Sequence, residues 1–532
     1  MSRVITRRDF LKGSAAGAAG IALSGILGGS FVMAEETLAD SLTVGLQVDP
    51  ETFGPWTMAQ AARQQIMYFT IFEPLAMLTV DGEREMVLAK SVEAEGDMCY
   101  RIELYDYIYD SIGNHITASD VIFSFDQAIA QGALSWATKY LDHFDQEDDY
   151  TLLMYVQDES AVALDMLLKT VFIVSEESYN ASSDGFVTNP IGTGPYQLDS
   201  YTAGSEAQIS LRGEYWQTDE SLISTSATTG SIQNVTFKVI TDTTQLALAL
   251  EMGDVDAVPV GITTTDLGNF LNDDRTPKEG YNVETLLNPL LYFMAFNCGE
   301  NSPCADVNVR QAISYAIDMD AIVTNVFGTD AVTATTNSSP YYADYDEALD
   351  EAPAYGYDAD KAKELLEEAG YSDGDITLEL MINTESNYAQ VASLVQAYLT
   401  VIGISVNITT YESGLFTTTK NSETDWDMFL DCTQGLNTPG RMGLLDINGY
   451  TTGANGVFVT DDTLQSLFEA ANAATTYSTE TVTDLLTYVD EMDYVYPMFY
   501  QYSYVLTDDE VTEISVDRNY SLIYGKCTVL AD

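Results

Sequence analysis

Basic residues are scarce in this 532-residue chain, which has 21 Lys and Arg against 82 Asp and Glu and a formal net charge of -61. Nucleic acids are bound through clustered basic side chains, so this deficit excludes them as partners. The same charge disfavours an anionic membrane surface or a polyanionic substrate, and it favours neutral or cationic ligands.

Histidine and cysteine are also rare, with two His (His115 and His143) and five Cys in the whole chain. A zinc site or a His-dependent active site therefore has few candidate ligands, and the cysteines lack the C-x-x-C spacing of haem and iron–sulfur proteins. No Gly-x-Ser-x-Gly or His-Glu-x-x-His motif is present. We therefore expect no cofactor, no metal and no catalytic residues. A secreted hydrolase using paired carboxylates is the less favoured alternative.

The cysteine count is odd, so at least one thiol is expected to be free or to pair between chains. The sequence allows two alternative disulfides, Cys298–Cys432 and Cys298–Cys304, and does not decide between them.

The amino terminus carries an export signal. Thr6–Lys12 (TRRDFLK) matches a twin-arginine motif, and the Gly- and Ala-rich stretch Ser14–Met33 follows it. The glycines make this stretch too weak for a permanent membrane helix, and cleavage is predicted before Glu35. No Cys lies near that position, so a lipid anchor is not expected. Residues 1–34 are predicted to be a signal peptide, and the protein is expected in the periplasm or at the cell surface or outside it.

Strands and helices alternate along the rest of the chain. Ile376–Ile382 and Ile404–Thr410 read as strands on either side of a helical stretch, Tyr388–Ile402. This strand–helix–strand order predicts a parallel βαβ unit. Asp358 is placed to cap a helix that runs to Ala369.

Six sequence blocks occur in an order that resembles the extracellular solute-binding proteins of peptide/nickel-type ABC importers, solute-binding family 5. The blocks are Phe72–Leu75, Ile116–Ser124, Gly192–Tyr196, Ala249–Ala257, Asp306–Asp318 and Tyr357–Gly370. Each has an ordinary structural interpretation as well. Gly192 and Gly194 suit a tight turn, and Arg310 is interpreted as a structural ion-pair partner.

The resemblance implies an α/β fold, the two-lobed periplasmic-binding-protein clamshell (type II, peptide-binding subclass), with an extra insert subdomain in the first lobe. The implied lobe I combines residues 35–76, 188–290 and 506–532, the insert covers 77–187, and lobe II covers 291–505. The implied function is the substrate-binding component of an ABC importer, which captures a peptide or another small organic solute in an interlobe cleft. Its implied partner is an ABC permease in the membrane, and the protein is expected to be a monomer. A ligand-binding sensor subunit with the same fold is the alternative.

The ligand-binding residues implied by the resemblance are aromatic and polar side chains near that cleft. They are Phe53, Trp56, Trp136, Tyr140, Asn297, Thr433, Gln434, Leu436, Asn437 and Arg441. In peptide-binding relatives one loop position supplies an Asp for the peptide's ammonium group, and here Leu436 or Asn437 occupies it. Because an unpaired buried ammonium is costly, this departure disfavours ordinary peptides unless Asp431 or Asp446 substitutes.

Overall fold

The computed structural model describes residues 38–531, except 58–64, 69, 80–82, 97, 158–159, 226, 228–229, 231, 351–353, 385, 422–424, 434, 448–455 and 517–521. The chain forms two compact units. The central unit contains Leu287–Tyr502 together with Ser160–Val162, and the flanking unit contains the remaining described residues. The predicted bounds of lobe I, lobe II and the insert at 77–187 stay predictions.

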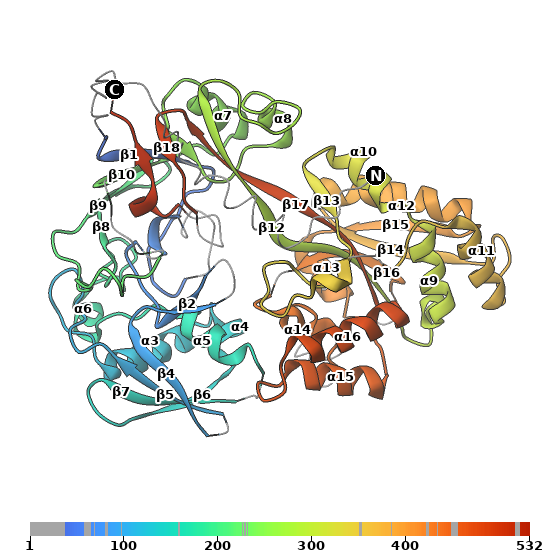
Figure 1. The fold of residues 1–532 in the computed structure, drawn as a ribbon, viewed down its shortest axis with the longest axis horizontal. Coiled ribbons are helices and arrows are strands. Elements are labelled where there is room, and N and C mark those ends of the chain that lie inside the picture. Colours follow the sequence, from blue (N-terminus) through green and yellow to red (C-terminus); the bar gives the residue numbers. More distant parts are fainter. Residues whose placement is uncertain are drawn as a thin grey trace, which may run out of the picture. The chain divides into compact units, whose positions relative to one another are not determined.

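The flanking unit contains two main sheets and short helices (Figure 1). One is the part β11-β1-β10-β9-β8 of an eleven-stranded sheet, and the other is a four-stranded sheet with the order β4-β5-β7-β6. Its strands are β1 Ser41–Leu46, β2 Ala76–Leu78, β3 Arg84–Met86, β4 Ala89–Gly96, β5 Cys99–Leu104, β6 Leu141–Gln146, β7 Thr151–Val156, β8 Tyr196–Thr202, β9 Glu206–Leu211, β10 Asn234–Val239, β11 Ala257–Val258, β18 Val511–Glu513 and β19 Thr528–Val529. Its helices are α3 Ala118–Gln131, α4 Ser135–Thr138, α5 Ala163–Thr170, α6 Glu176–Ala181, α7 Thr243–Glu251, α8 Thr264–Leu267 and the 3-10 helix η5 Tyr524–Lys526.

The central unit is built on the strand order β15-β14-β16-β12-β17, and β13 pairs with β17. Its strands are β12 Tyr281–Phe296, β13 Ala331–Thr333, β14 Thr377–Asn383, β15 Ser405–Tyr411, β16 Met428–Thr433 and β17 Val495–Asp508. Its helices are α9 Val307–Ala316, α10 Met319–Phe327, α11 Ala359–Glu368, α12 Ser386–Val401, α13 Ser413–Thr419, α14 Thr438–Arg441, α15 Asp462–Asn472, α16 Thr479–Met492 and the 3-10 helices η2 Pro303–Ala305, η3 Glu347–Asp350 and η4 Gly443–Leu445. The chain runs between the two units along β12 and β17.

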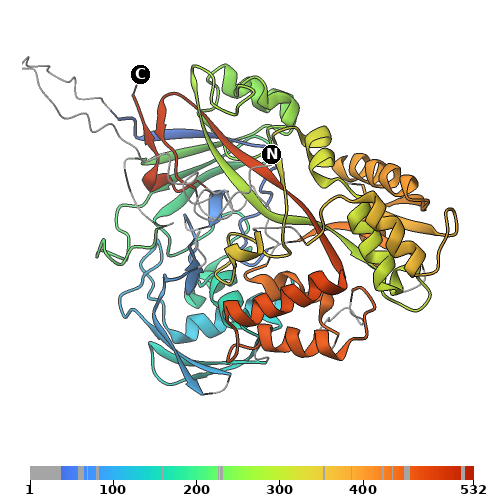
Figure 2. The ribbon, with the colours of Figure 1, turned by 45° about the vertical axis from the view of Figure 1, so that its right-hand side comes forward.

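Alternating residues of the central strands face two separate cores. On β12, Met294 and Phe296 pack with α9 to α12, whereas Phe293 and Ala295 pack with α13, α15 and α16. Successive strand residues point to opposite faces, so helices cover both sides of this sheet. Figure 1 shows α9–α12 in yellow and orange apart from the red α15 and α16, and Figure 2 shows these two red helices side by side.

The predicted βαβ unit is confirmed. β14 and β15 pair in parallel along their whole lengths, and α12 connects them. The predicted cap is also present, because the Asp358 side chain accepts a hydrogen bond from the Lys361 amide at the start of α11.

The glycines of the Gly192–Tyr196 block serve close backbone packing. A Cβ on Gly192 would lie 1.9 Å from the Ile71 carbonyl oxygen, and one on Gly194 would lie 2.2 Å from the Thr70 oxygen. Only glycine fits at such an approach, which supports the turn interpretation of this block.

Neither predicted disulfide is formed in the structure. Cys432 lies opposite Tyr292 in the β12–β16 ladder, while Phe296 lies opposite Met428. Four strand positions span about 13 Å, and Cys298 lies beyond Phe296, so its Cα is too far from that of Cys432 for a bond. In the other candidate pair, Cys298–Cys304, Cys304 is buried in η2. Among the described residues no helix combines the length and apolar character needed to span a membrane.

Candidate functional site

A pocket of about 500 Å³ lies within the central unit, on the side of the sheet covered by α13. Strands β12, β14 and β16 form its floor, and α13, α14 and the turn η4 form its walls. Phe293, Phe429 and Asp431 point to the same face because β12 and β16 are paired in register and side chains alternate along each strand. Its volume is in the range of sites for small organic ligands.

The lining combines aromatic rings with hydroxyl, amide and charged groups. Such a mixture lets apolar faces hold a ligand while a few polar groups orient it. The residues are Phe293, Asn383, Ser413, Phe416, Thr417, Lys420, Phe429, Asp431, Cys432, Thr433, Gly440, Arg441, Gly443, Leu444 and Gly456.

Two of the chain's few cations are in this pocket. The Lys420 ammonium lies 3.0 Å from an Asp431 carboxylate oxygen, and it also lies 5.7 Å and 5.9 Å from the ring centroids of Phe416 and Phe429. The ion pair and the rings together balance its charge. Lys420 stands on the otherwise uncharged segment 413–421 and was not predicted as a site residue. An isolated cation in so acidic a chain is the signal that could have identified it.

Arg441 is the second cation, and its side chain is almost fully buried, with 3% of its surface exposed. Its Nε and Nη2 atoms donate to the Asn337 carbonyl oxygen at 3.0 and 2.7 Å, and Nη2 also donates to Asn337 Oδ1 at 3.1 Å. Its Nη1 atom has no hydrogen-bond partner among the described residues. Burial lowers the pKa of the guanidinium, yet Arg remains charged because its ordinary pKa is so high.

The loop before Arg441 is fixed by buried hydrogen bonds. Asn437 caps α14, and its side-chain oxygen accepts from the Gly440 amide at 2.8 Å. The amide and hydroxyl of Thr438 donate to the two carboxylate oxygens of buried Asp344 at 2.9 and 2.8 Å. Desolvation raises the pKa of that carboxyl group. The side chains that line the pocket from this loop are therefore held in place before any ligand arrives.

Among the predicted site residues, Thr433 and Arg441 line the pocket. Asn297 is fully buried and donates through Nδ2 to the Trp426 carbonyl oxygen at 2.8 Å. Leu436 is half-buried, and Gln434 lies outside the described residues.

Four predicted residues belong to the flanking unit. Phe53 and Trp56 are fully buried there, and Trp56 Nε1 donates to the Phe172 carbonyl oxygen at 2.9 Å. Trp136 on α4 is half exposed, and Tyr140 packs against the Lys139 ammonium. A ligand-binding role for these four residues stays a prediction.

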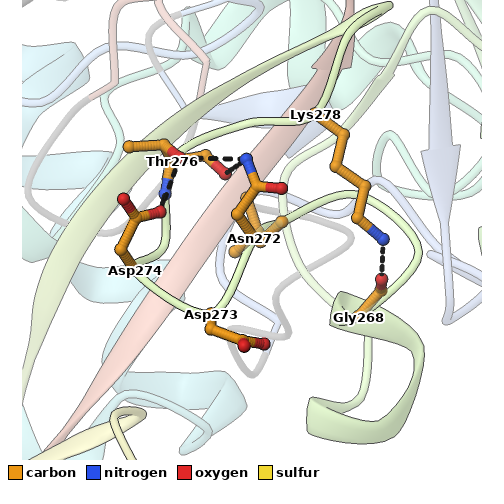
Figure 3. A pocket seen from close by; sticks show the side chains of 7 residues that line it. Gly268, Asn272, Asp273, Asp274, Thr276 and Lys278 are labelled. Atoms are coloured by element: carbon orange, nitrogen blue, oxygen red, sulfur yellow. Dashed lines mark hydrogen bonds between the residues drawn. The ribbon is translucent and has the colours of Figure 1, made fainter.

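A second pocket, of about 490 Å³, lies in the flanking unit after α8 (Figure 3). Its polar groups mostly bond to one another. Asn272 Nδ2 donates to Thr276 Oγ1 at 3.0 Å, the Thr276 hydroxyl donates to Asp274 at 2.6 Å, and the Lys278 ammonium donates to the Gly268 carbonyl oxygen. These bonds define a surface turn, so the central pocket is the stronger candidate site. In the described part of the chain no cluster of His, Cys, Asp and Glu is arranged to hold a metal ion.

Residues 83–456 match the family model "Bacterial extracellular solute-binding proteins, family 5 Middle". The chain belongs to this family. Residues 4–24 match the twin-arginine translocation signal, which confirms the predicted signal and export to the periplasm or cell surface. That signal lies outside the described residues.

Relatives within the family differ in the ligands that their names state. The chain is 25% identical over 323 residues to the dipeptide-binding protein of Escherichia coli, covering 56% of this chain and 57% of that protein. It is 26% identical over 322 residues to heme-binding protein A of Haemophilus influenzae, covering 56% and 55%. The matched segments thus span little more than half of these curated relatives.

The solved structure of HbpA2 from Haemophilus parasuis has the same fold, with a TM-score of 0.79 and 19% identity over 92% of this chain and all of that chain. The predicted fold class, the α/β two-lobed periplasmic-binding-protein fold, is confirmed.

Proposed function

We propose that this family 5 protein is the substrate-binding component of an ABC importer. It captures a small organic solute or peptide outside the cytoplasm and delivers it to a permease in the membrane. The observation that carries the proposal is the family match over residues 83–456. The export signal and a pocket of ligand size support it.

Binding by this pocket is non-covalent and needs neither a catalytic residue nor a resident cofactor. The rings of Phe293, Phe416 and Phe429 offer apolar faces, and the hydroxyl groups of Ser413 and Thr417 offer donors and acceptors. The protein acts as a monomeric receptor that releases its ligand chemically unchanged.

The carboxylates near the predicted ammonium position are engaged elsewhere. Asp431 is ion-paired with Lys420, and Asp446 accepts a hydrogen bond from Gln465. Asn437 uses its side-chain oxygen to cap α14. These contacts disfavour a ligand held by its ammonium group, which is the arrangement that an ordinary peptide would need.

The test is to denature the purified protein and identify released solutes by mass spectrometry. Calorimetric titration with peptide, amino-sugar and metal-chelate panels follows. A stoichiometric solute recovered unchanged, or saturable binding of a panel member, is the expected result. Steady conversion of a bound compound would support a hydrolase instead, and a complete lack of saturable binding would count against a receptor.

A further inference from the structure

The Arg441 guanidinium combines deep burial with incomplete hydrogen bonding. Its three bonds all go to one uncharged residue, Asn337, and Nη1 has no partner in the described structure. Burial of an unsatisfied charged donor is costly, so such a group is rarely retained unless something binds it.

The pocket around Arg441 carries an uncompensated positive charge. Lys420 is neutralised by Asp431, but the described residues place no carboxylate within 4 Å of the Arg441 guanidinium. The chain has a net charge of -61 and therefore many Asp and Glu side chains that could pair with Arg441. Its absence next to a pocket-lining Arg points to a negative charge that arrives with the ligand.

We infer that the pocket binds its solute through an anionic group, a carboxylate held by Arg441 Nη1. This inference rests on the proposed solute-binding function and specifies its ligand class. It also reverses the expectation, drawn from net charge alone, that the protein favours neutral or cationic ligands.

Charge and geometry together favour a carboxylate over a phosphate. Arg441 offers one unbonded nitrogen and one net charge, which suits a monoanion. A multiply charged phosphate would need several cationic donors and would be repelled by the surrounding acidic protein. The rings of Phe293 and Phe429 would contact the apolar part of the solute.

The experiment uses a matched library of small organic acids and N-acetylated amino acids and dipeptides, each as the free acid and as its carboxamide. Dissociation constants are measured by calorimetry for the wild-type protein, Arg441→Gln and Arg441→Lys. The control is Arg310→Lys, which alters a buried guanidinium outside the pocket.

We expect the wild-type protein to bind acids about 10- to 100-fold more tightly than their amides, the value of a charge-assisted hydrogen bond. Arg441→Gln abolishes this preference, and Arg441→Lys reduces it because an ammonium cannot bond Asn337 and the ligand in the same geometry. The control retains the preference. A merely structural role for Arg441 would lower the melting temperature without changing the acid-to-amide ratio.

Equal binding of acids and amides by the wild-type protein would overturn the inference and leave the receptor function standing. This comparison needs no variant, so it decides the question even if Arg441→Gln does not fold. Absence of saturable binding by every acid and amide would count against the receptor function and the inference together.

Discussion

Two buried arginines in the central unit differ in how their donors are used. Arg310 bonds through Nε to the Met492 and Asp493 carbonyl oxygens, through Nη1 to those of Cys304 and Ala305, and through Nη2 to Met492 again. Arg441 leaves Nη1 without a partner among the described residues and lines a pocket. Burial by itself therefore does not mark a functional cation, and the ligand role proposed for Arg441 rests on its unused donor and its place in the pocket lining.

The hydrogen bonds of Arg310 give it a structural role. Its partners are the last carbonyls of α16 and the carbonyls of η2, which have no partner within their helices. A cation at a helix carboxyl end is also favoured by the helix dipole. The predicted structural role is present, with backbone carbonyls as the bonded partners instead of the expected ion pair.

The largest expected effect comes from removing Arg310. Arg310→Gln leaves several buried carbonyls without donors, so we expect the free energy of unfolding to fall by about 3 kcal/mol or more. Urea unfolding followed by circular dichroism measures this change. A loss below about 1 kcal/mol would mean that the hydrogen bonds of Arg310 contribute little to stability and that its role is not mainly structural.

The Arg310 region is also expected to respond to pH. Burial raises the pKa of the Asp493 carboxyl to about 7, against the opposing effects of its hydrogen bond from Ser314 and of the Arg310 charge. The folded protein then keeps this proton up to about pH 7, whereas the unfolded chain releases it near pH 4. The stabilising contribution is complete below pH 4 and is lost as the pH rises to 7.

Asp493→Asn keeps the shape of the neutral acid and tolerates the left-handed backbone at this position, where φ is 50°. Relative to the wild-type protein, its unfolding free energy should rise by roughly 1–3 kcal/mol between pH 4 and 7. Thermal melts across that range measure the difference. A constant difference between variant and wild type would show that Asp493 does not titrate there.

Arg441→Gln should cost less stability than Arg310→Gln. The substitution removes hydrogen bonds to Asn337 but also relieves an unpaired buried charge, so we expect a loss of about 1–2 kcal/mol. Urea unfolding of the two variants side by side gives the order. If Arg441→Gln were the more damaging change, Arg441 would be mainly a structural residue.

The smallest effect is expected at Lys420. Its ion pair with Asp431 is partly exposed, so Lys420→Gln should lower the unfolding free energy by less than about 1 kcal/mol. It should nevertheless weaken carboxylate binding several-fold, because Asp431 is then left uncompensated in the pocket. Calorimetry checks this against Lys361→Gln, which breaks the exposed pair with Glu364 on α11 and should leave binding unchanged.

The sequence predicted those features that depend on local pattern. Asp358 caps its helix, and β14, α12 and β15 form the expected unit, because capping and periodicity are set by neighbouring residues. Of the two disulfides left open, Cys298–Cys432 is excluded by the register of two distant strands. Spacing along the chain contains no information about that register.

The site was only partly predictable for the same reason. Thr433 and Arg441 were predicted from their place in one loop, but Asn337, which holds Arg441, lies 104 residues away. Whether a donor of Arg441 is left unbonded depends on residues that are distant in the sequence, so no local motif can predict it. Lys420 was not predicted as a site residue because its neighbours form no motif, although the sequence shows it as the charged residue of an otherwise uncharged segment.

A crystal structure with the natural solute bound would show whether Arg441 binds an anionic group of the ligand. We predict an anionic oxygen of the solute at about 2.7–2.9 Å from Arg441 Nη1, the distance of a charge-assisted hydrogen bond. A neutral or cationic solute, or a ligand that leaves Nη1 without an anionic partner, would contradict it.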